Sequence, residues 1–311
     1  MTVGRFLTSH WLPAIEPTVR SSTFTSYRTH VLTHVAPRIG SAQLDAIDAP
    51  TLNSLYAALL ANGRAKGVGA LSPSTVRRIH ATLHRALRDA VRWGHLEVNP
   101  ADRCDPPRPL VREAYCWSPQ ELRAFLEAVR DDDLHVLWHF LALTGVRRGE
   151  ALGLRWENVD LRRARAAISQ SVIIVGGVVQ PSQPKTKRGR RVIALDELTV
   201  RLLAKHRQVT ERHPLVFCRE DGSPLNPGAV TRRFGRLVGA AGLPRIRLHD
   251  LRHTHATMAL RAGIHPKVVS ERLGHSSVSI TLDLYSHAGE SLQAEAAARV
   301  AEVVFASPRA G

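Results

Sequence analysis

The sequence predicts a mainly α (α+β) protein: an N-terminal helical domain, then a mostly helical domain with a small antiparallel sheet. Apolar residues recur at helical spacing, with capping residues at the segment ends, over most of the 311 residues. The spacing changes to that of strands only between about residues 166 and 195. Three prolines within residues 102–112 cannot continue a helix, so we place a boundary near Pro109, between domains 1–108 and 109–311.

Three helices are expected in the N-terminal domain. The first spans residues 22–35 and should stop at Pro37. The second spans 48–63, with an aspartate as its N-cap, a proline in its first turn and a glycine at its end. The third and longest, 72–94, carries apolar residues inward at helical spacing and ends at a Trp-Gly pair.

The other face of the third helix is basic, with Arg77, Arg78, Arg85, Arg88 and Arg92. Most charge runs of this kind are solvated helix surfaces. The formal net charge of +16 adds a strong positive field, which favours a polyanionic partner and most simply nucleic acid. The charge supports a DNA-binding face without requiring one.

Cysteine content and hydropathy narrow the class of protein. Three cysteines with no C-x-x-C pair suggest neither a disulfide framework nor a zinc site, and they fit a reduced compartment. The first 17 residues lack the continuous apolar core of a signal peptide, and no later apolar run is long enough to cross a bilayer. We expect a cytoplasmic protein that makes no membrane contact.

The second domain is expected to begin with a helix at Ser118, followed by an almost wholly apolar helix at 134–143. Residues 166–195 then read as strands around a Gly176-Gly177 turn and a polar loop, which together predict one small antiparallel sheet. The later elements expected are a helix at 197–208, an apolar segment at 215–218, a turn at 221–224, a basic helix at 229–240 and a C-terminal helix at 291–305.

The chemistry is concentrated in the stretch from His249 to His287. His249 and Arg252 lie one helical turn apart and share a face, while His275 and Tyr285 follow further along. An arginine fork can hold two phosphate oxygens, a histidine can donate or move a proton, and a tyrosine oxygen can be a nucleophile. A phosphoryl transition state needs a second cation, which the segment L-T-G-V-R around Arg147 can supply.

These motifs resemble the tyrosine recombinases of the phage-integrase family. The family's ordered pattern is an arginine in T-G-x-R-x-x-E, a lysine on a hairpin, H-x-x-R, L-G-H and a tyrosine. The pattern falls on six residues of this chain: Arg147, Lys185, His249, Arg252, His275 and Tyr285. Spacing alone could not choose between Arg147 and Arg148, and the family pattern assigns the role to Arg147.

The resemblance implies a role for each of these residues. Tyr285 is the nucleophile that attacks a DNA phosphate and forms a 3′-phosphotyrosine, with His249 as its proton acceptor. Lys185 protonates the leaving 5′-oxygen, and Lys187 is the alternative for that role. The phosphate is clamped by Arg147, Arg252 and His275, and two further residues, Glu150 and His253, orient the catalytic side chains.

The resemblance also implies partners. Double-stranded DNA is expected to be gripped by the N-terminal core-binding domain and the catalytic domain, in a homotetramer on two DNA sites that needs no metal or nucleotide cofactor. The C-terminal helix is expected to dock on a neighbouring protomer. Accessory DNA-bending and directionality proteins remain open. The candidate DNA-binding residues are Arg77, Arg78, Arg85, Arg88, Lys187, Arg232 and Arg233.

Several alternatives stay open at the level of sequence. Within the family, a chromosome-dimer resolvase competes with an enzyme that integrates or excises a phage or mobile element. A type IB topoisomerase shares the chemistry but fits the motif spacing less well, and a non-catalytic DNA-binding regulator leaves six filled positions unexplained. A metal-dependent phosphohydrolase would use the cluster His249, Asp250, His253, His255, His265 and His275. The core-binding helices begin almost at Met1, which leaves open an arm-binding domain ahead of them.

Overall fold

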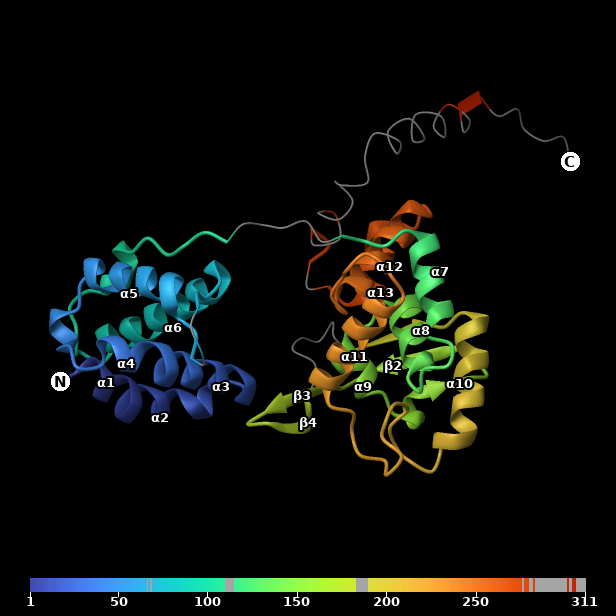
Figure 1. The fold of residues 1–311 in the computed structure, drawn as a ribbon, viewed down its shortest axis with the longest axis horizontal. Coiled ribbons are helices and arrows are strands. Elements are labelled where there is room, and N and C mark those ends of the chain that lie inside the picture. Colours follow the sequence, from blue (N-terminus) through green and yellow to red (C-terminus); the bar gives the residue numbers. More distant parts are fainter. Residues whose placement is uncertain are drawn as a thin grey trace, which may run out of the picture. The chain divides into compact units, whose positions relative to one another are not determined.

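A computed structural model gives the fold of the chain (Figure 1). It describes residues 1–65, 67, 69–109, 115–182, 190–275, 277–279, 282, 301, 304 and 305. The chain divides into two compact units, Met1–Glu113 and Ala114–Gly311, which are described in turn. Among the described residues, no helix combines the length and the apolar character that a membrane crossing requires.

The first unit is entirely helical apart from its connections. Its α-helices are α1 Val3–Arg5, α2 Leu12–Ile15, α3 Ser21–Thr29, α4 Ala36–Ile39, α5 Ala49–Asn62 and α6 Pro73–Arg92, and the wider or tighter turns between them are η1 Phe6–Trp11, η2 Glu16–Thr18, η3 His30–Val35, η4 Leu44–Ala46 and η5 Pro100–Arg103. Helix α6 buries Val76, Ile79 and Leu83 on one face, as its apolar spacing predicted. Together with Trp11 and Leu52 they form the core of this unit.

The caps of the two longer helices are as predicted. Asp48 accepts the amide of Thr51 at the start of α5, and Ser72 accepts the amide of Thr75 at the start of α6. The sequence had suggested that the first helix stops at Pro37, and this prediction is wrong. The chain passes through the π-helical turn η3 and continues as α4, with Pro37 in its first turn, where a missing N–H costs little.

The second unit is also mostly helical. Its α-helices are α7 Pro119–Ala128, α8 His135–Thr144, α9 Arg148–Leu152, α10 Glu197–Thr210, α11 Pro227–Ala240, α12 Asp250–Arg261 and α13 Pro266–Leu273, and a short turn, η6 Trp156–Asn158, precedes the first strand. The strands are β1 Val159–Asp160, β2 Arg165–Ile168, β3 Ser171–Val175, β4 Val178–Ser182 and β5 Arg191–Ala194. The predicted capping box at the start of α7 is present, since Ser118 and Glu121 each accept the other's backbone amide.

The predicted antiparallel strands are confirmed, but they form two small sheets where one was expected. One sheet has the order β1-β2-β5 and the other is the hairpin β3-β4, all antiparallel. The break falls at Ser169 and Gln170, where the chain leaves strand geometry. The Gln170 amide donates to Gly153 O, so this side chain ties the break to the end of α9. Such a side-chain contact cannot be predicted from the alternation of apolar residues along a strand.

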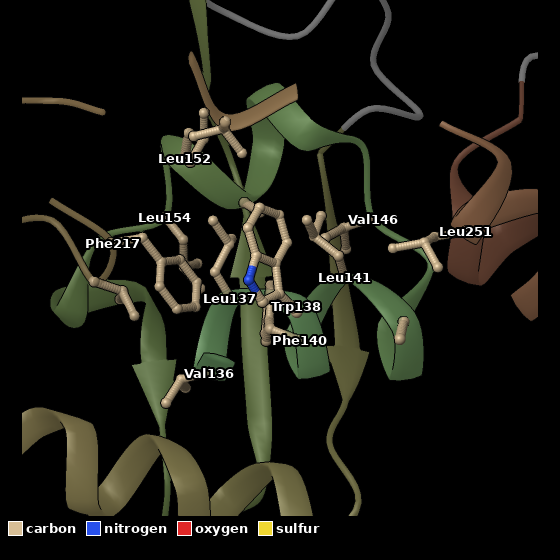
Figure 2. Packing of buried hydrophobic residues seen from close by; sticks show 14 of the residues in the cluster. Val136, Leu137, Trp138, Phe140, Leu141, Val146, Leu152, Leu154, Phe217 and Leu251 are labelled. Atoms are coloured by element: carbon tan, nitrogen blue, oxygen red, sulfur yellow. The ribbon is translucent and has the colours of Figure 1, made fainter. Parts of the chain in front are cut away.

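The core of the second unit surrounds α8 (Figure 2). Trp138 and Phe140 are fully buried, and Val146, Phe217 and Leu251 from other parts of the unit belong to the same cluster. Helix α8 packs against α10 on one side and α12 on another, which explains why its sequence is apolar almost all round. Its C-terminal end is therefore held rigidly where the candidate active site begins.

Candidate active site

The turn after α8 places Arg147. Helix α8 ends at Gly145, whose positive φ of 65° reverses the chain direction, and the buried Val146 anchors the turn. Arg147 follows as the residue before α9. A Cβ at Gly145 would lie 2.5 Å from Leu273 Cδ2 and 2.7 Å from His255 Cδ2, so the turn is packed tightly against α12 and α13.

Glu150 fixes the Arg147 side chain. Arg147 Nη1 donates to Glu150 Oε1 at 2.8 Å, and the Arg147 amide donates to Glu150 Oε2 at 3.0 Å. Burial alone would raise the pKa of Glu150, but hydrogen bonds and charge from Arg191, and then from Arg147, bring the pKa below its ordinary value. Glu150 is therefore a charged carboxylate at neutral pH. Of the two partners that the sequence suggested for it, an arginine or a histidine, it binds the arginine.

The neighbouring arginine points elsewhere. Arg148 is half-buried and its Nη1 donates to the Thr231 hydroxyl on α11. Arg147 instead donates from Nη2 to Gly274 O at 3.0 Å, beside His275. The structure thus separates the two arginines that spacing alone could not, and it brings Arg147 to the other candidate residues.

Arg252 lies on α12 and is 4% exposed. Its Nη1 donates to Gly145 O at 3.0 Å, while its buried Nη2 has no hydrogen-bond partner among the described residues. Burial and then the charge of Arg147 lower its pKa to about 9, so it stays protonated at pH 7. A buried donor on a cation without a partner is costly, and an anion such as a phosphate oxygen would satisfy it.

His275 is the third buried group, 7% exposed, and directly follows the left-handed Gly274 that ends α13. Its amide donates to Ser270 O at 3.0 Å. Burial, followed by the charges of Arg252 and Arg147, lowers the pKa of His275 to about 4. The ring is neutral at pH 7, so it can donate a hydrogen bond to an anion without adding charge to the pocket.

His249 and His253 lie together at the start of α12. Their rings meet edge to face, 5.2 Å between centroids and at 90°. His249 is exposed on one side. Desolvation of its packed side, with smaller contributions from His253 and Arg252, lowers its pKa, so it is neutral and able to accept a proton at pH 7.

The remaining members of the histidine and aspartate cluster each make separate hydrogen bonds within the protein. Asp250 accepts the backbone amide, Nε and Nη2 of Arg247. His255 Nδ1 lies 3.2 Å from Ala142 O, and His265 accepts the Lys267 amide at the start of α13. Within the described ranges, no group of three or more histidine, cysteine or acidic side chains is placed to hold a metal ion.

Two arginines that the sequence did not suggest lie behind these residues. Arg191, at the start of β5, donates to both carboxylate oxygens of Glu150 and to Arg272 O. Arg272, near the end of α13, donates to Ala194 O and Leu143 O. The signal in the sequence was weak, because Arg191 follows a basic loop and opens a short strand, and nothing in the alternation of that strand shows that its side chain is buried.

Three predicted residues, Lys185, Lys187 and Tyr285, lie outside the described residues. So does the expected C-terminal helix at 291–305, apart from positions 301, 304 and 305. The described part of the pocket thus joins Arg147, Arg252 and His275, with His249 beside them.

The candidate DNA-binding arginines divide into two groups. Arg77, Arg78 and Arg88 are exposed on α6, and Arg232 is exposed on α11. Arg85 instead donates to the Tyr27 hydroxyl and lies over its ring, 5.5 Å from the centroid. Arg233 forms ion pairs with Asp132 and Asp133. Both of these arginines already hold protein groups.

The fold and this cluster define a class: a mainly α protein whose second unit gathers arginines and neutral histidines, side chains of the kind that bind an anion. The family model described as "Phage integrase family" matches residues 118–291. The chain therefore belongs to the phage integrase family, the tyrosine recombinases, as its motifs had predicted.

Individual relatives match most of this chain. A "Tyrosine recombinase XerC-like" protein of Caldanaerobacter subterraneus subsp. tengcongensis is 23% identical over 92% of this chain and 79% of its own length. The structure of the Tn1549 transposon integrase with a circular intermediate DNA matches at a TM-score of 0.81 and 22% identity, over 96% of this chain and 99% of that one. A lambda integrase tetramer bound to a Holliday junction matches at 0.71 and 19% identity, over 91% and 77%.

Proposed function

We propose that the protein is a site-specific DNA recombinase of the integrase type, which cuts and rejoins DNA through a 3′-phosphotyrosine at Tyr285. The observation that carries the proposal is the buried Arg252 Nη2, which lacks a protein partner in the described part of the chain. A phosphate oxygen would complete its hydrogen bonding. Arg147 and the neutral His275 supply further donors around the same place.

The reaction is a pair of transesterifications. The Tyr285 oxygen attacks the phosphorus, its proton passes to His249, and the bond to the 5′-oxygen breaks as Lys185 donates a proton to it. The 5′-hydroxyl of another strand then attacks the phosphotyrosine and releases the tyrosine by the reverse path. The bond energy stays in the covalent link, so neither step needs a nucleotide. Arg147, Arg252 and His275 stabilise the charge on the phosphate oxygens during both steps.

The partner is double-stranded DNA, gripped both by a core-binding domain, 1–108, and by a catalytic domain, 109–311. Arg77, Arg78, Arg88 and Arg232 support this because they are exposed and lie on two helices. A homotetramer on two DNA sites is supported by the lambda integrase tetramer named above. The enzyme would then act in the bacterial cytoplasm, on the nucleoid, with or without accessory DNA-bending and directionality proteins.

The substrate class is a phage or mobile-element end that is integrated or excised. The likeness to a transposon integrase supports this choice. A chromosome-dimer resolvase is the second candidate, because one relative carries a XerC-like name. The two differ in their sites: an integrating element supplies an attachment site beside the recombinase gene, whereas a dimer resolvase acts at a chromosomal site elsewhere.

A recombination assay tests this proposal. Purified protein is mixed, in excess EDTA, with a plasmid that carries two direct copies of the DNA flanking its own gene. We expect an excised circle that contains one copy of the site. Circles formed only with a site taken from the chromosomal terminus region would favour the dimer resolvase. Cutting that appears only after magnesium or manganese is restored would contradict the tyrosine mechanism and favour a metal-dependent nuclease.

A further inference from the structure

Arg191 stands behind the pocket and joins three segments that are distant in sequence. Its side chain is 8% exposed. Its Nη2 donates to Glu150 Oε2 at 2.9 Å and its Nη1 to Glu150 Oε1 at 3.3 Å. Its Nε donates to Arg272 O at 2.6 Å. The guanidinium is therefore directed at protein groups, one on α9 and one at the end of α13.

Glu150 connects this arginine to the phosphate-binding residues. Its two oxygens accept from Arg191 and also from the side chain and amide of Arg147. Arg147 in turn donates to Gly274 O, and Arg191 to Arg272 O. Two carbonyl groups shortly before His275, those of Arg272 and Gly274, are thus held by two arginines that share one carboxylate.

The Arg272 side chain connects the same turn to two further segments. Its Nη1 donates to Ala194 O on β5 at 2.9 Å, and its Nη2 to Leu143 O near the end of α8 at 3.3 Å. Strand β5 and helix α13 therefore hold each other through reciprocal arginine-to-carbonyl bonds. The end of α8, from which Arg147 extends, is connected to the same turn.

We propose that Arg191 is a positioning residue for strand cleavage, which acts through Glu150 and Arg272 to fix Arg147 and the His275 turn around the phosphate. This inference rests on the proposed recombinase function. The competing account is a buried ion pair that contributes to stability alone. The two accounts differ because a positioning residue affects the rate of the covalent step more than DNA affinity or global unfolding.

The electrostatics of the pocket support the positioning account. Arg147 and Arg191 together outweigh the single charge of Glu150, so their pairing leaves a positive field for the phosphate. After burial, the pKa of His275 is lowered by Arg252, Arg147, His253 and Arg191, in that order. Loss of Arg191 would therefore also allow His275 to take up a proton at a higher pH than in the wild type.

The test compares Arg191→Met, Arg191→Lys, Glu150→Gln and the double variant Glu150→Gln/Arg191→Met. The DNA is a nicked duplex from the flanks of the protein's own gene. For Arg191→Met we expect single-turnover adduct formation to fall about 100-fold, as small misplacements of catalytic groups do, with DNA affinity changed less than about threefold. Arg191→Lys should recover part of the rate, because lysine keeps the charge but lacks the fork.

The double variant tests the coupling between the two residues. If Arg191 acts through Glu150, the double variant should be no slower than the slower of the two single variants, because both changes break the same path from Arg191 to Arg147. Arg201→Met is the matched control. It removes an arginine whose ion pair with Glu197 lies on the exposed face of α10, and it should leave the rate unchanged.

Hydrogen exchange supplies a readout that does not depend on cleavage. In Arg191→Met the amides of Gly274 and His275 should exchange at least about tenfold faster, while those within α10 keep their wild-type rates. Cleavage within about threefold of wild type together with unchanged exchange at this turn would overturn the proposal. A uniform rise in exchange across the second unit would also overturn it, in favour of a purely stabilising ion pair. If wild type forms no adduct, the proposed function fails, while the exchange result still decides the positioning role.

Discussion

At the scale of single residues, the candidate site contains a charged group, Arg252, that is buried but incompletely satisfied. Arg252 gives one donor to Gly145 O and keeps a second, buried donor without a partner in the described ranges. Such a group costs stability in the free protein and gains a partner when an anion arrives. Because Gly145 O belongs to the turn before Arg147, the two arginines are placed by the same piece of backbone.

Replacement of Arg252 by lysine tests the use of its guanidinium fork. Lysine keeps the charge but lacks the planar fork that lets Arg252 direct one nitrogen at Gly145 O and another at a phosphate oxygen, so we expect adduct formation to fall roughly 10²–10³-fold. Single-turnover kinetics on a nicked substrate measures this. Arg261→Lys, at the exposed end of the same helix, is the control and should behave as wild type. A rate for Arg252→Lys equal to that control would show that the fork is not used.

The pH dependence of stability tests the neutral state of His275. Its pKa is lowered from 6.5 to about 4, so between these values the unfolded chain binds the proton and the folded chain does not. The contribution of His275 to stability is therefore present above pH 6.5 and lost as the pH falls toward 4. Urea unfolding at several pH values should show wild type losing roughly 1–3 kcal/mol more than His275→Gln across this window. Parallel curves for the two proteins would contradict the lowered pKa.

Some residues of the site could be predicted and others could not. Arg147, His249, Arg252 and His275 could be proposed together because each stands in a short motif and the motifs occur in the family's order, and the structure brings the four near one another. Arg191 was missed because its partners, Glu150 and Arg272, lie 41 and 81 residues away. Arg85 and Arg233 were grouped with exposed arginines because helical spacing defines a face but does not show that Tyr27 or Asp132 reaches it.

At the scale of elements, the turn between α8 and α9 has little freedom. Gly145→Ala would place a Cβ at a positive φ and against Leu273 and His255, so we expect a loss of about 2–4 kcal/mol in the free energy of unfolding. Chemical denaturation of the purified variant measures it.

Gly242→Ala is the matched control for that turn. Its φ of 66° is almost the same as that of Gly145, but no heavy atom lies within 4 Å of the added carbon. It should lose only about 1–2 kcal/mol, the cost of the backbone conformation alone. Equal losses of stability in the two variants would show that Leu273 and His255 do not resist an added carbon at Gly145.

Helix α11 offers a neighbouring pair of arginines with different expected effects. Arg232 is exposed and Arg233 is bound to Asp132 and Asp133. We expect Arg232→Ala to reduce the salt dependence of DNA binding by about one counterion, and Arg233→Ala to reduce stability with little change in that slope. Binding measured at several salt concentrations distinguishes them. A reduced salt dependence with Arg233→Ala instead of Arg232→Ala would contradict this prediction, and it would mean that Arg233 leaves Asp132 and Asp133 and contacts DNA.

Elements with local signals were predicted well. Asp48, Ser72 and Ser118 each cap the helix whose start they predicted. The errors came where tertiary packing overrides local preference: the chain remains helical through Pro37, and one apolar run is divided between two sheets at Gln170. Caps act within one turn of a helix, whereas these features depend on neighbours that are distant in sequence.

At the scale of the whole molecule, the proposed activity would draw on both units. The first offers exposed arginines on α6, and the second holds the buried cations and neutral histidines of the pocket. The domain class followed from the sequence because caps and apolar spacing act locally. The reaction followed from an ordered set of motifs, which fixes the chemistry of a phosphate site better than composition or charge does.

The most direct test of this account is a covalent trap. Wild type and Tyr285→Phe are each incubated, in excess EDTA, with a nicked duplex from the flanks of the protein's own gene, and the products are separated under denaturing conditions. We expect a protein–DNA band with wild type and none with Tyr285→Phe, because Tyr285 forms the covalent link. An adduct that persists in Tyr285→Phe, or DNA cut without any adduct once a divalent metal is restored, would contradict it.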